Sequence, residues 1–219
     1  MTTELTNPLL DVVNRALKSK PEGPAAKLHE RFANAGSDVV ALCDVSGSME
    51  SYVGSTHASR FDHLVAALED VVKGFPKLVI VAFSSRATVS DVASFKNQQQ
   101  AIRKANSGNW APKPFDALGG STDMGGALEY VAGRWKPRKT ILITDGQPDD
   151  QWRALEAVEL LTGSVDCIYC GPDADPAVDF LKRLARAGVG TQVTWDGTAE
   201  LAPVLRRLAL PAPRGPIEL

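Results

Sequence analysis

The sequence predicts an α/β fold in which a mostly parallel sheet is covered by helices on both faces. Short, continuous apolar runs of strand length recur along the chain, and segments with apolar residues at helical spacing separate them. Glycine or proline marks many of the boundaries. Strands that alternate with helices of this length are typical of parallel sheets.

The predicted strands are short and mostly apolar. Val39–Cys43 and Leu78–Phe83 contain no charged residue, which is typical of strands buried on both faces. The more polar segment Arg86–Ser90 is expected to be a short edge strand. Further strands are predicted at Thr140–Thr144, Val165–Cys170 and Gly190–Trp195.

Apolar residues three and four positions apart predict the helices. One begins near Arg60, presents Phe61, Leu64 and Leu68 on one face, and ends at Gly74. The other predicted helices are Gln98–Ala105, Met124–Arg134, Trp152–Thr162, a segment capped by Asp175 that ends at Gly188, and a last segment capped by Thr198.

The chain is expected to divide into three parts. Residues 1–36 read as an N-terminal helical extension, in which Leu10, Val13 and Leu17 form an apolar stripe. Residues 37–210 form the α/β domain, and the proline-rich residues 211–219 are expected to be a flexible tail.

Composition excludes several classes of protein. The formal net charge is -2 and no basic stripe is present, so nucleic acid is not an expected partner. Three cysteines do not make a secreted disulfide framework. The first residues lack the apolar core of a signal peptide, and no apolar run is long enough to cross a bilayer. A cytoplasmic location without membrane contact is therefore expected.

Oxygen-bearing side chains gather at three points where strands end or helices begin. Asp44–Ser48 follows the first strand, Gly119–Asp123 precedes a helix, and Thr144–Gly146 closes the fourth predicted strand. In a parallel sheet, sites form outside the carboxyl ends of the strands. Carboxylates and hydroxyls without imidazole or thiolate favour a hard cation. Gly47 is expected to let the first of these loops curl around it.

Asp-x-Ser-x-Ser, a later Thr and a later Thr-Asp-Gly resemble the metal-ion-dependent adhesion site of von Willebrand factor A (VWA) domains. The resemblance covers about residues 37–210 and implies a standalone, bacterial-type member with this site intact. It implies a six-stranded, doubly wound, Rossmann-like sheet with a central first strand and one antiparallel edge strand. The ion would be Mg²⁺, or Mn²⁺ or Ca²⁺, and the implied ligands are Asp44, Ser46, Ser48, Thr122 and Asp145.

We therefore expect a protein-binding module rather than an enzyme. The resemblance implies that the ion engages an Asp or Glu of a protein partner, with side contacts from Tyr52, His57 and Trp110. Standalone intracellular bacterial relatives often work beside MoxR-type AAA+ ATPases or in tellurite-resistance-like clusters. An assembly of either kind is the implied setting.

Two alternatives remain open. One is a metal-dependent phosphohydrolase at the same sheet edge. Against it, Ser46 stands where a second Asp would be needed, and neither a nucleophile nor a Lys or Arg clamp is expected beside Asp44. The other alternative is a structural VWA domain without metal function.

Several nearby residues have plainer interpretations. Asp123 is expected to cap a helix, and Asp149 and Asp150 to favour the dipole of the helix that follows them. Cys167 and Cys170 have the Cys-x-x-Cys spacing of a redox pair. In a strand, however, residues three apart point to opposite faces, so packed thiols are expected.

Overall fold

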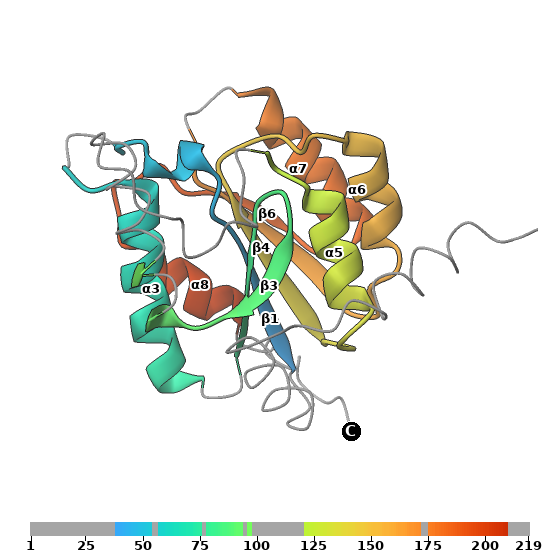
Figure 1. The fold of residues 1–219 in the computed structure, drawn as a ribbon, viewed down its shortest axis with the longest axis horizontal. Coiled ribbons are helices and arrows are strands. Elements are labelled where there is room, and N and C mark those ends of the chain that lie inside the picture. The colour runs from blue at the N-terminus through green and yellow to red at the C-terminus, as the bar shows by residue number, and fades with distance from the viewer. Residues whose placement is uncertain are drawn as a thin grey trace, which may run out of the picture.

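Six strands form a single sheet in the order β3-β2-β1-β4-β5-β6 (Figure 1). The computed structural model describes residues 38–53, 57–75, 78–93, 96–97, 121–171 and 175–209. The helical extension (1–36), the helix expected at Gln98–Ala105, Trp110 and the tail (211–219) lie outside the described residues.

The sheet is parallel except at one edge. β1 (Val39–Asp44) lies between β2 (Val79–Phe83) and β4 (Lys139–Thr144) and is parallel to both. β5 (Ser164–Tyr169) and β6 (Gln192–Thr194) continue the parallel order. β3 (Ala87–Ser90) pairs antiparallel with β2. The predicted doubly wound fold with one short antiparallel edge strand is therefore confirmed.

Helices cover both faces of the sheet (Figure 1). α3 (Arg60–Gly74) and α8 (Leu201–Ala209) share one apolar cluster. The second cluster lies on the other face and contains α5 (Met124–Ala132), α6 (Gln151–Val158) and α7 (Pro176–Ala187). A short 3-10 helix, η1 (Gly47–Glu50), follows β1. None of the helices in the described segments has the length and apolarity needed to cross a membrane.

The alternation of side chains along β1 explains why this strand is apolar throughout. Ala41 and Cys43 belong to the cluster with α3 and α8, whereas Val40 and Leu42 belong to the cluster with α5, α6 and α7. Successive residues of a strand point to opposite faces, and here each face is covered. The only polar side chain of β1, that of Asp44, stands at its carboxyl end.

Several predicted helix boundaries were wrong, and α5, for example, ends at Ala132 rather than at Arg134. α6 ends at Val158 rather than at Thr162, because the amides of Leu160 and Leu161 bond to carbonyls three residues back, as in turns. α8 begins at Leu201, so Thr198 is not its cap. The amide and hydroxyl of Thr198 instead donate to Oδ1 of Asp196, at 2.9 and 2.6 Å.

The change of direction in the strand order fixes where a site can form. The chain runs from β1 outward to β2 and β3, then returns to the other side of β1 at β4. In open α/β sheets, ligands bind outside the carboxyl ends of the strands at such a switch point. Here the two strands are β1 and β4, which end at Asp44 and Thr144.

Candidate metal-binding site

Asp44 is the innermost candidate and is held from both sides. Its side chain is fully buried at the end of β1. Oδ1 accepts the Ser46 amide at 2.8 Å, and Oδ2 accepts the Thr144 hydroxyl at 2.6 Å. Burial raises the pKa of this carboxyl to about 6, although the hydrogen bonds from Thr144 and Ser46 oppose the rise. At neutral pH the site therefore holds a buried, ionised carboxylate, and no Lys or Arg of the described residues is bonded directly to it.

Three further candidates form a chain of side-chain oxygens beside it. The hydroxyl oxygens of Ser46 and Ser48 are 3.0 Å apart, and the Ser48 hydroxyl donates to Oδ1 of Asp145 at 2.8 Å. Two ligands of an octahedral Mg²⁺ that lie at right angles are about 3.0 Å apart, because each sits roughly 2.1 Å from the ion. The spacing and the chemistry of these oxygens therefore fit a small, hard cation.

The loop that carries the serines does not depend on glycine for its shape. Gly47 begins η1, and a Cβ built there would meet nothing within 4 Å. The only glycine with positive φ among the described residues is Gly197. The expectation that Gly47 lets the loop curl was wrong, since a single turn of 3-10 helix makes the bend.

Arg60 also reaches this cluster. Its Nη1 lies 2.7 Å from Oδ2 of Asp145 and 3.1 Å from the carbonyl oxygen of Ser48. The arginine side chain is only 14% exposed, and that of Asp145 only 1%. No Lys or Arg clamp was expected beside Asp44, and Arg60 indeed bonds to Asp145 and to the Ser48 carbonyl rather than to Asp44.

Thr122 stands on a neighbouring loop. Its amide donates to both carboxylate oxygens of Asp149, at 3.0 and 3.1 Å, and its carbonyl accepts the Asp149 amide. Within the described residues, its hydroxyl makes no hydrogen bond with the other four candidates. The structure thus joins Asp44, Ser46, Ser48 and Asp145, and it links Thr122 to Asp149 on the segment that follows β4.

The other acidic residues at this edge have structural roles. Asp123 caps α5 by accepting the Gly126 amide, and Asp150 caps α6 by accepting the Arg153 amide. The Asp123 prediction is confirmed. Asp149 does more than favour a helix dipole, because it holds the backbone of Thr122.

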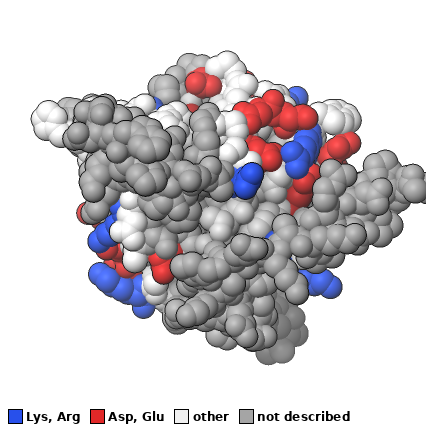
Figure 2. Space-filling view, viewed as in Figure 1, with Lys and Arg blue, Asp and Glu red and all other residues white. Residues whose placement is uncertain are grey.

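Figure 2 shows acidic side chains gathered beside basic ones over α5 and α6. Arg153 contributes to this pattern by pairing with Asp123 at 3.0 Å and with Glu129 at 2.7 Å. No group of three or more His, Cys, Asp or Glu side chains is arranged to hold a metal in the described segments. An ion between Asp44 and Asp145 would therefore need hydroxyl oxygens and water in its shell as well.

Two exposed aromatic side chains follow the strands that end at the site. Tyr52 comes after η1 and is 70% exposed, and Trp152 lies in the first turn of α6 and is 72% exposed. Of these two residues, Tyr52 was expected to contact a partner, whereas Trp152 was not. His57 is exposed. His63 is half-buried, with its ring centroid 5.0 Å from that of Trp195.

The cysteines lie in the core, away from solvent. Cys167 belongs to the cluster with α5, α6 and α7, whereas Cys170 belongs to the cluster with α3 and α8. Their predicted opposite facing is therefore confirmed. Both thiols are free, as is Cys43. Burial raises the pKa of all three thiols.

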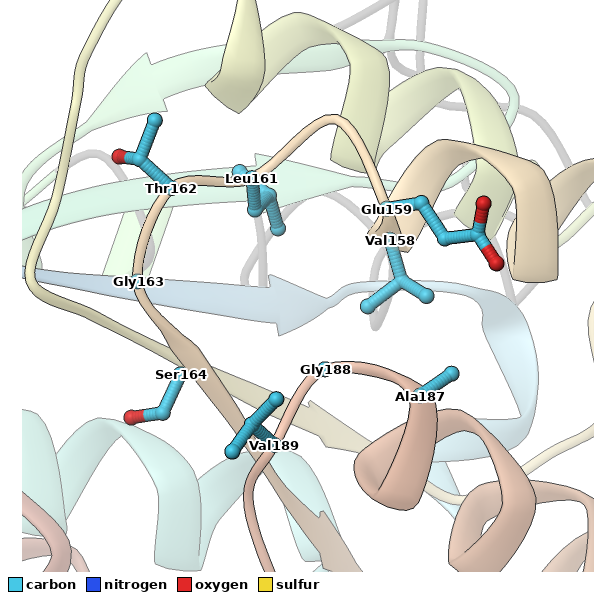
Figure 3. Close-up of a pocket in the computed structure, with 9 residues that line it drawn as sticks. All are labelled: Val158, Glu159, Leu161, Thr162, Gly163, Ser164, Ala187, Gly188 and Val189. Carbon is cyan, nitrogen blue, oxygen red and sulfur yellow. The ribbon is translucent and has the colours of Figure 1, made fainter.

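A separate depression lies at the opposite edge of the sheet. It has a volume of about 590 Å³ and is formed by the end of α6, the start of β5 and the turn after α7 (Figure 3). Among the described residues that line it, Glu159 supplies the one carboxylate, and the others are apolar side chains, glycines, and Thr162 and Ser164 with their hydroxyls. No strand carboxyl end borders it, so the Asp44 cluster is the stronger candidate.

Sequence reasoning missed two residues of the site, Arg60 and Asp149. A basic residue in the first turn of a helix is unfavourable to the helix dipole, and Arg60 occupies that position directly after the Ser59 cap. This signal points to an external acidic partner for Arg60. The sequence offered no comparable means of separating Asp149 from the adjacent cap, Asp150.

The comparisons agree with the fold. Residues 14–193 match the sequence model of the family described as VWA domain containing CoxE-like protein, so the chain belongs to that VWA family. Among solved structures, it is similar to BatB from Bacteroides thetaiotaomicron, a conserved hypothetical protein (16% identity, TM-score 0.54, covering 78% of this chain and 96% of the other). It is also similar to a von Willebrand factor type A protein from Catenulispora acidiphila (23% identity, TM-score 0.51, covering 77% of this chain and 41% of the other). A search of curated proteins gave no match.

Proposed function

We propose that the chain is a protein-binding module that holds one divalent cation and uses it to engage an acidic side chain of a partner. The observation that carries this proposal is the row of oxygens from Ser46, Ser48 and Asp145, spaced at 3.0 and 2.8 Å beside the buried Asp44. Mg²⁺ suits such a set, with Mn²⁺ or Ca²⁺ as substitutes. The membership of the VWA family supports the same proposal.

The residues at the site favour a ligand supplied from outside. Asp44 and Asp145 carry two negative charges, and Arg60 already offsets one of them. When bound, a divalent cation supplies positive charge with coordination positions that the protein does not fill. A hard cation in that condition prefers an anionic oxygen to water. An Asp or Glu of a protein partner supplies such an oxygen.

The surroundings suit a partner that also has apolar surface. Tyr52 and Trp152 are large, exposed side chains on segments that leave the two central strands. Aromatic side chains are enriched where protein interfaces bury their central contacts. We propose that these two contact the partner around the shared carboxylate.

We further propose that this binding occurs within a cytoplasmic assembly of bacterial type. The VWA resemblance favours an assembly with a MoxR-type AAA+ ATPase or with tellurite-resistance-like proteins. Thr122 is one residue before the Asp123 cap of α5, so partner binding there has a direct route to that helix.

The first experiment measures the metal itself. Calorimetric titration of the full chain with Mn²⁺ should show one weak site, which Asp44→Ala abolishes. Asp145→Ala should weaken it strongly. Asp150→Ala removes the same charge from the same sheet edge but only uncaps α6, so it should bind Mn²⁺ almost as the wild type does. Equal binding by the wild type and Asp44→Ala would refute the proposed site.

The second experiment measures the partner. Affinity capture from the source cell should recover the same protein with Mg²⁺ or Mn²⁺ present and lose it with EDTA. Ser46→Ala, Thr122→Ala and Asp145→Ala should each lose it too. Replacing one acidic residue of the captured protein should be as damaging as EDTA. A partner whose affinity survives EDTA and all three substitutions binds elsewhere on the domain.

One observation bears on the alternative of a phosphohydrolase. Arg60 supplies the basic group that the sequence did not lead us to expect. Its guanidinium is already bonded to Asp145 and the Ser48 carbonyl, and Ser46 still occupies the position where a second acidic residue would be needed. We therefore retain the binding module. Turnover of a generic phosphoester that is lost in Asp44→Ala would reverse this choice.

A further inference from the structure

Arg60 is built into the candidate site in a specific way. Its guanidinium contacts Oδ2 of Asp145, whereas the Ser48 hydroxyl contacts Oδ1 of the same carboxylate. One face of Asp145 is thus occupied by a permanent positive charge, and the other face turns toward the row of hydroxyl oxygens. Arg60 does not need to leave for Oδ1 to serve a cation.

The backbone around Arg60 fixes this arrangement. Ser59 caps α3 and forms a capping box with Asp62, which determines where the helix begins. The Arg60 amide donates to the carbonyl of Ser51, which ties the helix start to the segment after η1. Arg60 therefore projects from a well-defined first turn toward the end of β4.

The position is costly for an arginine, which argues for a function at the cluster. A cation in the first turn of a helix opposes the helix dipole. The Nε of Arg60 is buried and has no hydrogen-bond partner within the described residues. The guanidinium is nevertheless held 2.7 Å from Asp145. The charge of the arginine is therefore placed to act on the site rather than on the helix.

A count of charges shows what that action is. Asp44, Asp145 and Arg60 sum to one negative charge, so a divalent cation brings the site to one positive charge, and a partner carboxylate then brings it to zero. Without Arg60, the net charge is two negative for the empty site, zero with the cation bound, and one negative once the partner carboxylate has joined. Arg60 therefore opposes the cation and favours the carboxylate.

We propose that Arg60 couples the two binding events at this site, keeping the cation weakly bound until an acidic ligand joins it. This inference rests on the proposed metal-dependent function and adds a regulatory residue to it. The chain alone then holds the ion loosely, and the carboxylate of a partner makes the complete set stable. The acidic ligand and the ion bind cooperatively. The ion gives the site a net positive charge, and the carboxylate of the acidic ligand neutralises that charge.

The test uses Arg60→Gln, which removes the charge while keeping a long polar side chain. Mn²⁺ affinity, measured by electron paramagnetic resonance of the free ion, should rise about tenfold or more. This holds even if the repulsion between Arg60 and the ion is screened as strongly as in bulk water. Acetate is the carboxylate probe, added to the Mn²⁺-loaded full chain and followed by water-proton relaxation. Acetate affinity should fall about threefold or more.

Two control variants separate charge from other effects. Arg206→Gln removes the same charge from the surface pair with Asp70, on the helices α8 and α3, and should change neither affinity. Arg60→Lys keeps the charge and should bind Mn²⁺ within about twofold of the wild type, even though lysine lacks the planar donor fork of arginine. Thermal unfolding of each variant reports whether the fold is retained.

The proposed coupling requires that Arg60→Gln raise the Mn²⁺ affinity and lower the acetate affinity. Arg60→Gln that weakens both Mn²⁺ and acetate binding would mean that Arg60 only positions Asp145, and the coupling is wrong. Unchanged affinities in Arg60→Gln, or an Arg60→Lys variant that behaves like Arg60→Gln, would also overturn it. A wild type that binds no Mn²⁺ would instead refute the proposed function, which distinguishes the two failures.

Discussion

Thr144 donates its hydroxyl to Oδ2 of Asp44 across 2.6 Å and so links the carboxyl ends of two adjacent parallel strands. The two residues are 100 positions apart in the sequence. Both side chains are fully buried. This hydrogen bond, together with the one from the Ser46 amide, is what keeps an ionised carboxylate inside the domain.

Asp44→Asn is expected to stabilise the metal-free protein at neutral pH. The pKa of Asp44 is raised from 3.8 to about 6, so the folded state holds a proton that the unfolded state loses, and stability falls as pH rises from about 4 to 6. The loss is on the order of 3 kcal/mol for this group. Asn avoids it, since Thr144 can turn its hydroxyl toward the Gly146 carbonyl.

Urea unfolding in EDTA measures this difference. The advantage of Asp44→Asn over the wild type should grow between about pH 4 and pH 6. Other titrating groups contribute equally to both proteins and cancel. A pH-independent difference would show that Asp44 is not the group responsible.

Thr144→Val should destabilise the domain by about 1–3 kcal/mol, because a similar shape is kept while a buried carboxylate loses a donor. Mn²⁺ affinity should fall as well, since Asp44 is then less firmly oriented. Thr140→Val is the matched control, because its buried hydroxyl on the same strand has no hydrogen-bond partner in the described part of the chain. Equal losses of stability in the two variants would contradict the role given to Thr144.

Asp149→Ala should loosen the segment around Thr122 with little effect on global stability. The carboxylate is exposed, and within the described residues the Thr122 amide is its one hydrogen-bond donor. Amide hydrogen exchange should therefore accelerate at residues 122–124. Asp150→Ala should instead accelerate exchange in the first turn of α6 and cost about 1 kcal/mol, as the loss of a helix cap does. Identical exchange patterns would mean that the two aspartates share one role.

The three cysteines should resist modification in the folded protein. All three are buried, and burial raises the pKa of each thiol, which removes the reactive thiolate. Mass spectrometry after iodoacetamide treatment should find them unmodified in buffer and alkylated in denaturant. A double Cys167→Ser and Cys170→Ser variant should keep its Mn²⁺ affinity in oxidant and reductant alike. A redox-dependent change seen only when both thiols are present would contradict this expectation.

The sequence predicted the sheet because its two central apolar runs, Val39–Cys43 and Leu78–Phe83, are free of charged residues, and glycine or proline marks many of the boundaries between strands and helices. It also located Asp44, Ser46, Ser48 and Asp145, since each lies at or just beyond a predicted strand end. Arg60 could be assigned to a helix start, but its contact with Asp145 joins segments 85 positions apart. Spacing along the chain carries no information about such a contact. Helix ends such as Val158 depend on the choice between α-helical and turn hydrogen bonds, which the residue types at that point do not determine.

The location of Asp44 on the central strand has a consequence for how the domain opens. Proteins open in cooperative units, and segments with few neighbours exchange before those at the centre of a sheet. β1 and β4 have strands on both sides, whereas β3 and β6 are the short outer strands. Transient detachment of either border strand leaves the pairing of Asp44 with Thr144 untouched. The inner half of the cluster therefore persists through partial opening and is dismantled only when the whole domain unfolds.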